Sequence, residues 1–261
     1  MIPLHDKNPL HRTPVLTIGL IVANVVAYFG LQLLQIDADG IVLRPSGGEL
    51  DSQQAIVCEY GLVPAHLIGG GDSSSGETVA GAVTCLSVNE EQPRFLGLFS
   101  SQFLHGDIWH LGFNMLFLWV FGNNIEDRLG RLRFLPFYLL CGAAAGLAQA
   151  LADPSSDIPV IGASGAIAGV LGAYLVLYPR VWVWTVVLPF FFLPFKIPAW
   201  TWLGIYFALQ LLFLGESATS GDGGIAFFAH VGGFVAGMLL IKPFLVGRPP
   251  PAPPAPAIPS Y

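Results

Sequence analysis

Charged residues are scarce in this chain, making up 11% of its 261 residues against about a quarter in soluble domains. Together with 54% hydrophobic residues and a mean hydropathy of +0.65, this scarcity excludes a soluble globular enzyme. Basic residues are fewer than acidic ones, 11 against 17, and they form no run along the chain. Because nucleic-acid binding depends on a basic surface, that function is excluded as well.

Cysteine is also scarce, with three residues in the chain. Cys141 lies within an apolar run, which indicates a small packing residue. Cys58 and Cys85 lie in the same long polar segment, where two alternatives stay open: a disulfide bond if the compartment is oxidising, or two free thiols. The sequence predicts neither a metal site nor a bound cofactor.

What the chain does contain is a set of long runs without charge. Six of them have 18 to 24 residues, at 13–36, 108–125, 134–152, 158–179, 197–215 and 223–241. Each is long enough to cross a bilayer as a helix, since a span needs about 20 apolar residues. We therefore expect an all-α membrane protein with six transmembrane helices, embedded in a lipid bilayer.

The charges between the runs predict the orientation, because cytoplasmic loops carry an excess of Lys and Arg. With both termini inside, the inner segments hold 9 of the 11 basic residues and the outer segments hold 14 of the 17 acidic residues. A seventh charge-free run, 181–195, is short and contains Pro189 and Pro194, which weaken a helix. We expect it to lie at the inner interface, with Trp182 and Trp184 in the aromatic belt.

The chain divides into a cytoplasmic N-terminus at 1–14, a membrane domain at 15–245 and a proline-rich, disordered cytoplasmic tail at 246–261. A long outer loop at about 37–107 separates the first two spans. The first span resembles a secretory signal in its basic start and apolar stretch. However, it is longer than a typical signal core and no small-residue cleavage site follows it, so a retained helix is favoured.

Four polar side chains lie inside the predicted spans at a similar depth below the outer boundary. His110 and Asn114 are spaced i, i+4 and share one helix face. Ser164 lies near the start of the fourth span and His230 near the start of the sixth. Small residues flank Ser164 and follow His230, so these two helices are expected to approach closely.

Serine beside histidine is the minimum pair for acyl transfer, because the imidazole takes the hydroxyl proton and later protonates the leaving amine. The spans contain no Asp or Glu that would orient His230, so we expect a catalytic dyad of Ser164 and His230. His110 and Asn114 are suitable donors for an oxyanion hole. Taken singly, each residue has a plainer interpretation: Ser164 as a packing residue, His230 as a proton relay or ligand, and His110 with Asn114 as an interhelical hydrogen bond.

The joint pattern resembles the rhomboid family of intramembrane serine proteases over about residues 103–237. The resemblance is carried by four motifs: His110-x-x-x-Asn114, Glu126-x-Arg128-x-Gly130, Gly162-Ala163-Ser164-Gly165, and Ala229-His230-x-Gly232-Gly233 with Gly237. The motif around Ser164 differs from the G-x-S-x-G elbow of soluble hydrolases, because position 166 is alanine.

The resemblance implies a six-helix bundle in which Ser164 is the nucleophile, His230 the general base, and His110 and Asn114 help to form the oxyanion hole. It also implies substrates that are single-span membrane proteins, cleaved near the outer face. The pattern departs from some members at Ala168, where those members carry an aromatic residue that stacks on the histidine. It also lacks their Trp-Arg pair in the first outer loop.

Two other functions stay open: a catalytically inactive relative that binds membrane clients, and a transporter. An inactive relative need not keep both Ser164 and His230. A transporter needs polar groups at several depths, whereas the polar residues here lie mainly on one side. The short N-terminus and the six spans are compatible with a bacterial plasma-membrane protein. The oligomeric state cannot be inferred from the sequence.

Overall fold

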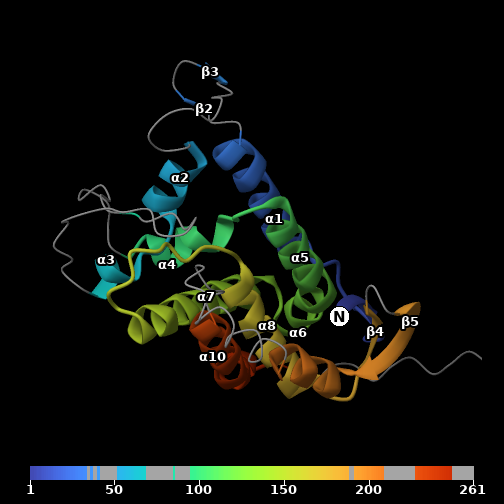
Figure 1. The fold of residues 1–261 in the computed structure, drawn as a ribbon. Coiled ribbons are helices and arrows are strands. Elements are labelled where there is room, and N and C mark those ends of the chain that lie inside the picture. Colours follow the sequence, from blue (N-terminus) through green and yellow to red (C-terminus); the bar gives the residue numbers. More distant parts are fainter. Residues whose placement is uncertain are drawn as a thin grey trace, which may run out of the picture.

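The computed structural model describes residues 1–33, 36–37, 40–41, 52–68, 85, 95–187, 191–208 and 227–248. Most of these residues are helical, as Figure 1 shows. Among the described residues, three helices are long and apolar enough to cross a membrane: Val15–Leu33, Arg131–Ala152 and Phe227–Leu245. The fold is therefore that of a helical membrane protein with several spans.

The first span is formed by α1 (Val15–Val26), which continues into the π-helical segment η1 (Ala27–Leu33). Its N-terminus has no side-chain cap of its own. The carboxylate of Glu126 takes that role, accepting hydrogen bonds from the backbone N–H groups of Leu16 and Thr17 at 2.9 and 2.7 Å and from the Thr17 hydroxyl at 2.8 Å. An anion at a helix N-terminus also opposes the positive end of the helix dipole, so Glu126 joins the first two spans.

The predicted second span, 108–125, corresponds to a continuous helical stretch of α5 (Ile108–Phe117), the π-helical η3 (Leu118–Gly122) and α6 (Asn123–Leu129). Asp107 caps its N-terminus by accepting from the N–H groups of Trp109 and His110. At its far end Gly130 has a φ of 73°, a conformation that glycine adopts readily. The chain then enters α7 (Arg131–Ala152) directly, so the third span follows without an intervening loop.

Helix α8 (Ser164–Leu177) is shorter than the predicted fourth span of 158–179, because it starts only at Ser164. The residues before it are extended instead, and Val160 pairs with Leu62 through two backbone hydrogen bonds of 2.8 and 3.1 Å. This pairing with the segment around Leu62 satisfies backbone groups that a longer helix would have satisfied internally. Helix α8 begins after this pairing.

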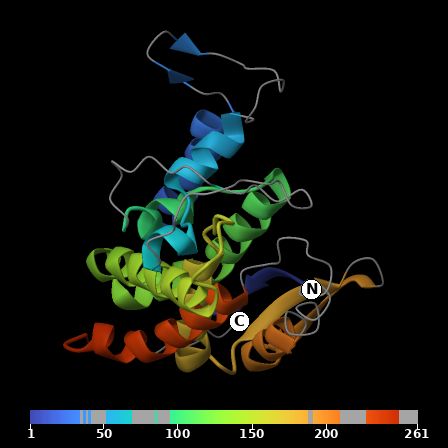
Figure 2. The same ribbon diagram turned by 60° about the vertical axis from the view of Figure 1, so that its left-hand side comes forward.

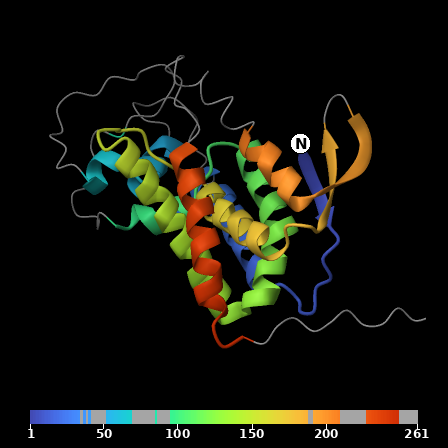
Figure 3. The ribbon, with the colours of Figure 1, turned by 90° about the horizontal axis from the view of Figure 1, so that it is seen from below.

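Helix α10 (Phe227–Leu245) packs against α8 and α7, and Figure 3 shows these three helices together. The contact with α8 is between backbones. A Cβ atom on Gly233 would collide with the carbonyl oxygen of Gly165, and one on Gly237 would collide with that of Gly169. The small residues expected to allow close approach do so at these positions.

A short antiparallel sheet lies beside the helices and corrects the all-α prediction. Its order is β1 (Ile2–Asp6), β4 (Trp182–Val187) and β5 (Phe191–Pro198), and Figure 2 shows it at one side of the bundle. The residues expected to lie flat at the interface thus form a hairpin. Tryptophan, valine and threonine favour extended structure over helix, and Pro194 is tolerated because β5 is an edge strand.

The described parts of the outer segment are α2 (Ser52–Tyr60), α3 (Pro64–Ile68), α4 (Gly97–Ser100), the 3-10 turn η2 (Ser101–Phe103), and the strands β2 (Ile36–Asp37) and β3 (Gly40–Ile41). Of the two alternatives for the outer cysteines, the structure shows the disulfide Cys58–Cys85. The N–H of Cys85 donates to the carbonyl of Asp157 at 3.0 Å, so the bridge connects α2 to the segment that precedes α8. The tail from residue 249 onward lies outside the described residues.

Candidate active site

Ser164 is the first residue of α8, and the turn before it depends on glycine. Gly162 has a φ of 119°, and a Cβ atom there would stand 2.8 Å from Nε2 of His110 and 3.7 Å from Oγ of Ser164. A side chain at position 162 would therefore be strained and would also displace His110. The N–H of Gly162 donates to the carbonyl of Ser101 at 2.9 Å, which connects the turn to η2.

His230 lies in the first turn of α10, and its Nε2 is 2.8 Å from Oγ of Ser164. The histidine side chain is buried, with 9% of its surface exposed. The backbone contacts between α8 and α10 hold this pair, because Gly233 and Gly237 lie on the same side of α10 as His230. The two residues are 66 positions apart in the sequence and meet only through helix packing.

His110 and Asn114 lie on α5 and face the same place. The side-chain N–H of Asn114 donates to the carbonyl of His110 at 2.9 Å, and the second hydrogen of that amide is left for another acceptor. Nδ1 of His110 accepts a long hydrogen bond of 3.4 Å from the N–H of Gly106. With Nδ1 accepting, the neutral imidazole carries its hydrogen on Nε2, the atom that lies close to Gly162.

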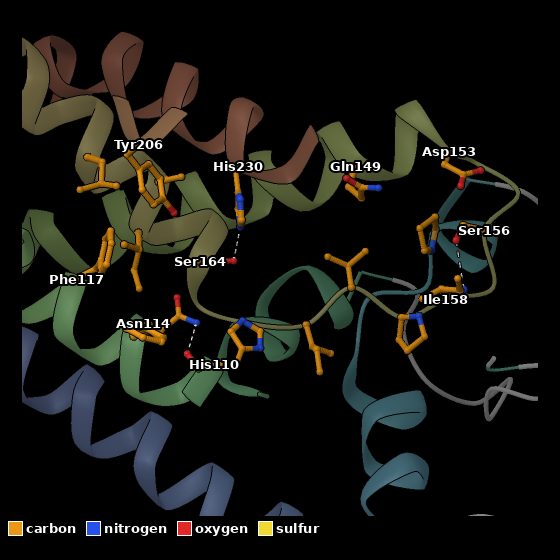
Figure 4. Close-up of a pocket in the computed structure, with 18 residues that line it drawn as sticks. His110, Asn114, Phe117, Gln149, Asp153, Ser156, Ile158, Ser164, Tyr206 and His230 are labelled. Carbon is orange, nitrogen blue, oxygen red and sulfur yellow. Dashed lines mark hydrogen bonds between the residues drawn. The ribbon is translucent and has the colours of Figure 1, made fainter. Parts of the chain in front are cut away.

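A cavity of about 570 Å³ adjoins all four side chains. Figure 4 shows Phe117 and Tyr206 at one end of it, Gln149, Asp153 and Ser156 at the other, and the Ser164–His230 pair between them. One end is thus aromatic, and the other has polar side chains among apolar ones such as Ile158. The Ser164–His230 pair lies between the two ends.

Several residues at the site carried no signal in the sequence analysis. Oε1 of Gln149 accepts from the N–H of Ala229 at 3.3 Å and so caps the start of α10 beside His230. Gln32 on η1 bonds both backbone groups of His105, accepting from its N–H at 2.9 Å and donating to its carbonyl at 2.8 Å. Both are polar side chains within apolar runs of the sequence. That pattern indicates a buried group that needs a hydrogen-bond partner, and it could have identified them.

His105 lies in the segment between η2 and α5, directly against the site. Its ring meets that of His110 edge to face, with the centroids 5.1 Å apart. Burial, followed by the nearby His110, lowers the pKa of His105 to about 3. The imidazole is therefore neutral near pH 7 and supports His110 by packing, without adding charge to the site.

The fold and this geometry define a class: a helical membrane protein with a serine–histidine pair at a partly polar cavity. Comparison with known families is consistent with that class, because residues 92–246 match the model of the rhomboid domain. The match covers more than half of the chain, and the protein belongs to the rhomboid family. The resemblance noted in the sequence is thereby confirmed.

Individual relatives match over shorter segments. The chain is 31% identical over 148 residues to Rhomboid protein 1, mitochondrial, of Saccharomyces cerevisiae, covering 55% of this chain and 40% of the relative. It is 46% identical over 72 residues to Rhomboid protease GluP of Bacillus subtilis, covering 28% and 14%. It is 31% identical over 153 residues to RHOMBOID-like protein 1 of Arabidopsis thaliana, covering 57% and 34%. The chain thus spans less than half the length of these relatives, and they include mitochondrial and plant proteins as well as a bacterial one.

Proposed function

We propose that this protein is an intramembrane serine endopeptidase that uses Ser164 and His230 as a dyad. The observation that carries the proposal is the 2.8 Å contact between Ser164 Oγ and His230 Nε2 at the wall of the cavity. This distance is within the range of a nucleophile and its general base. Membership of the rhomboid family, together with the name of the relative Rhomboid protease GluP, also supports it.

In the proposed reaction, Nε2 of His230 takes the proton of Ser164 as Oγ attacks the carbonyl carbon of the scissile peptide. The carbonyl π electrons move to oxygen, and the oxyanion is bound by His110 Nε2–H, the Asn114 amide and the Ser164 backbone N–H. His230 then protonates the leaving amine, which leaves an acyl ester on Ser164. Water then attacks that ester and gives a proton to His230. The bond between the acyl carbon and Oγ breaks, His230 returns the proton to Oγ, and the acid product is released.

The two ends of the cavity suit the two needs of this reaction. The aromatic end, with Phe117 and Tyr206, suits an apolar side chain of a transmembrane substrate. The polar end, with Asp153 and Ser156, suits the entry of water for hydrolysis. We propose single-span membrane proteins as substrates, cleaved near the outer face.

The proposal includes an arrangement of six spans with both termini inside. The described helices, the continuous helical stretch 108–129 and the helical residues 199–208 agree with six spans. The basic residues at the α6–α7 junction (Arg128, Arg131 and Arg133) and at the end of α10 (Lys242 and Arg248) support the orientation. In this orientation Ser164 and His230 lie toward the outer face of the membrane.

Labelling of the purified full chain with a fluorophosphonate probe tests the proposal. Wild type is expected to be labelled, whereas Ser164→Ala and His230→Ala are not. The first variant lacks the nucleophile, and the second lacks the base that activates it. Ser156→Ala is the matched control, since this serine lines the same cavity and its hydroxyl accepts from the N–H of Ile158. A folded wild type that stays unlabelled and cleaves no transmembrane substrate would overturn the proposal and favour a client-binding protein.

A further inference from the structure

A second cavity, of about 370 Å³, lies at the opposite end of α10 from the proposed catalytic pair. Its lining includes Arg12, Arg131 and Arg248, the carboxylates of Glu126 and Asp127, and the side chain of Leu132. His230 is in the first turn of α10, and Arg248 follows its last. At 1.5 Å per residue the two cavities are on the order of 20 Å apart, so the second is separate from the first.

This second cavity, hereafter the arginine pocket, carries an excess of positive charge. Arg128 and Arg133 lie within electrostatic range of Arg248, in addition to the arginines that line the pocket. The two carboxylates already have partners: Glu126 accepts three hydrogen bonds from the start of α1, and Asp127 accepts from the backbone and ring of His11. Three arginines of the lining, with Arg128 and Arg133 acting on Arg248 from nearby, therefore outnumber the two carboxylates of the pocket.

The fold holds these arginines close together against their mutual repulsion. Arg133 donates to the carbonyls of Phe244 and Val246 at 2.8 Å, and Arg248 donates to the carbonyl of Leu129. A Cβ atom on Gly130 would meet the guanidinium of Arg248, so this side chain lies directly against the α6–α7 junction. Burial, followed by repulsion from Arg12, Arg133 and Arg128, lowers the pKa of Arg248. Like charges gathered in this way are stabilised by a bound anion.

Backbone geometry adds to the attraction for an anion. The 22-residue helix α7 begins at Arg131, and Gly130, Arg131 and Leu132 all line the pocket. The first N–H groups of a helix lack intrahelical acceptors, and they lie at the positive end of the helix dipole. Phosphate groups bind at such helix starts.

Apolar side chains beside the pocket indicate what kind of phosphate compound fits. Leu132 lines the pocket and is 94% exposed, and Val246, beside Arg248 in the chain, is 73% exposed. In a membrane protein, apolar side chains next to arginines at the end of the spans suit an interface between headgroups and acyl chains. A free phosphate ester would use the arginines but would gain nothing from Leu132.

We propose that the arginine pocket binds the phosphate group of an anionic phospholipid, with the adjoining acyl chains against Leu132. The bound lipid would join the start of α1, the α6–α7 junction and the end of α10, which are the three elements around the pocket. The inference does not depend on the proposed protease activity, because it involves other residues and requires no chemistry.

Native mass spectrometry of the delipidated full chain, titrated with phosphatidylglycerol or phosphatidylcholine, tests the proposal. We expect clear preference for phosphatidylglycerol, and about fivefold weaker binding in each of Arg12→Gln, Arg131→Gln and Arg248→Gln, because each removes one basic group near an anionic headgroup. Arg180→Gln is the matched control, since Arg180 is exposed and lies outside the pocket. Arg131→Lys keeps the charge and is expected to keep most of the binding.

A second arm distinguishes the lipid from a free phosphate ester. Leu132→Ser is expected to weaken the binding of phosphatidylglycerol, and glycerol phosphate is expected to displace the lipid only weakly. Equal affinity for both phospholipids, or full retention of phosphatidylglycerol by the three glutamine variants, would overturn the proposal. Displacement by glycerol phosphate at equal concentration would overturn the assignment to a lipid. Thermal unfolding of each variant shows that it is folded, independently of binding.

Discussion

Helix α8 has two sides that differ in how they are filled. On the side facing α10, Gly165 and Gly169 contact the backbone at Gly233 and Gly237, and no room is left for a side chain. On the side facing α5, a cavity of about 570 Å³ separates it from His110 and Asn114. The closed side sets the distance between Ser164 and His230, whereas the open side leaves space for a substrate. Precision and access are thus provided by different faces of one helix.

Gly237→Ala is expected to have the largest effect, because it alters the closed side. The new Cβ atom would collide with the carbonyl group of Gly169, and both are backbone positions that cannot rotate away. We expect a loss of about 3 kcal/mol in the free energy of unfolding and loss of activity, measured by thermal unfolding and by fluorophosphonate labelling. Gly19→Ala is the matched control, since nothing lies within 4 Å of a Cβ atom there. Equal stability of the two variants would contradict the backbone contact.

Asn114→Ala alters only the open side. Removing one oxyanion donor is expected to lower the rate of substrate cleavage by about 100- to 1,000-fold. Thermal stability should change little, because the lost hydrogen bond to the His110 carbonyl is within the same helix turn. Cleavage of a transmembrane substrate in liposomes measures the rate. A near-normal rate in this variant would remove Asn114 from the proposed oxyanion hole.

The disulfide Cys58–Cys85 connects α2 to the segment that leads to Ser164. Replacing both cysteines by alanine is expected to lower the stability of the outer segment by about 3 kcal/mol, since it releases a constraint between residues 27 positions apart. Hydrogen exchange in 52–68 should rise, while cleavage should fall less than in Asn114→Ala. A reducing agent should raise hydrogen exchange in 52–68 of the wild type as well. It should leave the exchange of the double variant unchanged. Unaltered exchange after reduction would show that the bridge does not hold this segment.

Replacing Asp6, which lies on β1 away from the proposed catalytic pair, is expected to have the smallest effect on stability and none on cleavage. Burial raises its pKa above 3.8, although hydrogen bonds from Tyr174 and Asn124 oppose the shift. A raised folded-state pKa means that stability is greatest below pH 3.8 and decreases as the pH rises through the folded-state value. Asp6→Asn should lack this decrease and should leave cleavage unchanged. Thermal unfolding of wild type and Asp6→Asn between pH 3 and 7 measures this decrease in stability. A wild type that gains stability relative to the variant as the pH rises would contradict the raised pKa of Asp6.

The comparison of sequence and structure shows why some features were predictable. The i, i+4 spacing of His110 and Asn114 fixes them on one helix face whatever surrounds them, and the charge-free runs follow from the cost of burying charge in lipid. Helix α8 begins six residues after the charge-free run 158–179 does, because Val160 pairs with Leu62, a long-range contact. Strand β1 is not predicted for the same reason, since it meets β4 across most of the chain. The β4–β5 hairpin is local, but its apolar composition and its prolines also fit the interfacial segment that the sequence predicts.

By itself, the sequence determined the membrane class, the positions of most helices and the four polar residues at the proposed site, because these depend on local composition and helical period. Only the tertiary structure decided that Ser164 and His230 are 2.8 Å apart, that Glu126 caps α1, and that five arginines gather at one end of α10. These features depend on how closely helices approach one another. That approach is determined by contacts between residues distant in the sequence, which no local pattern contains.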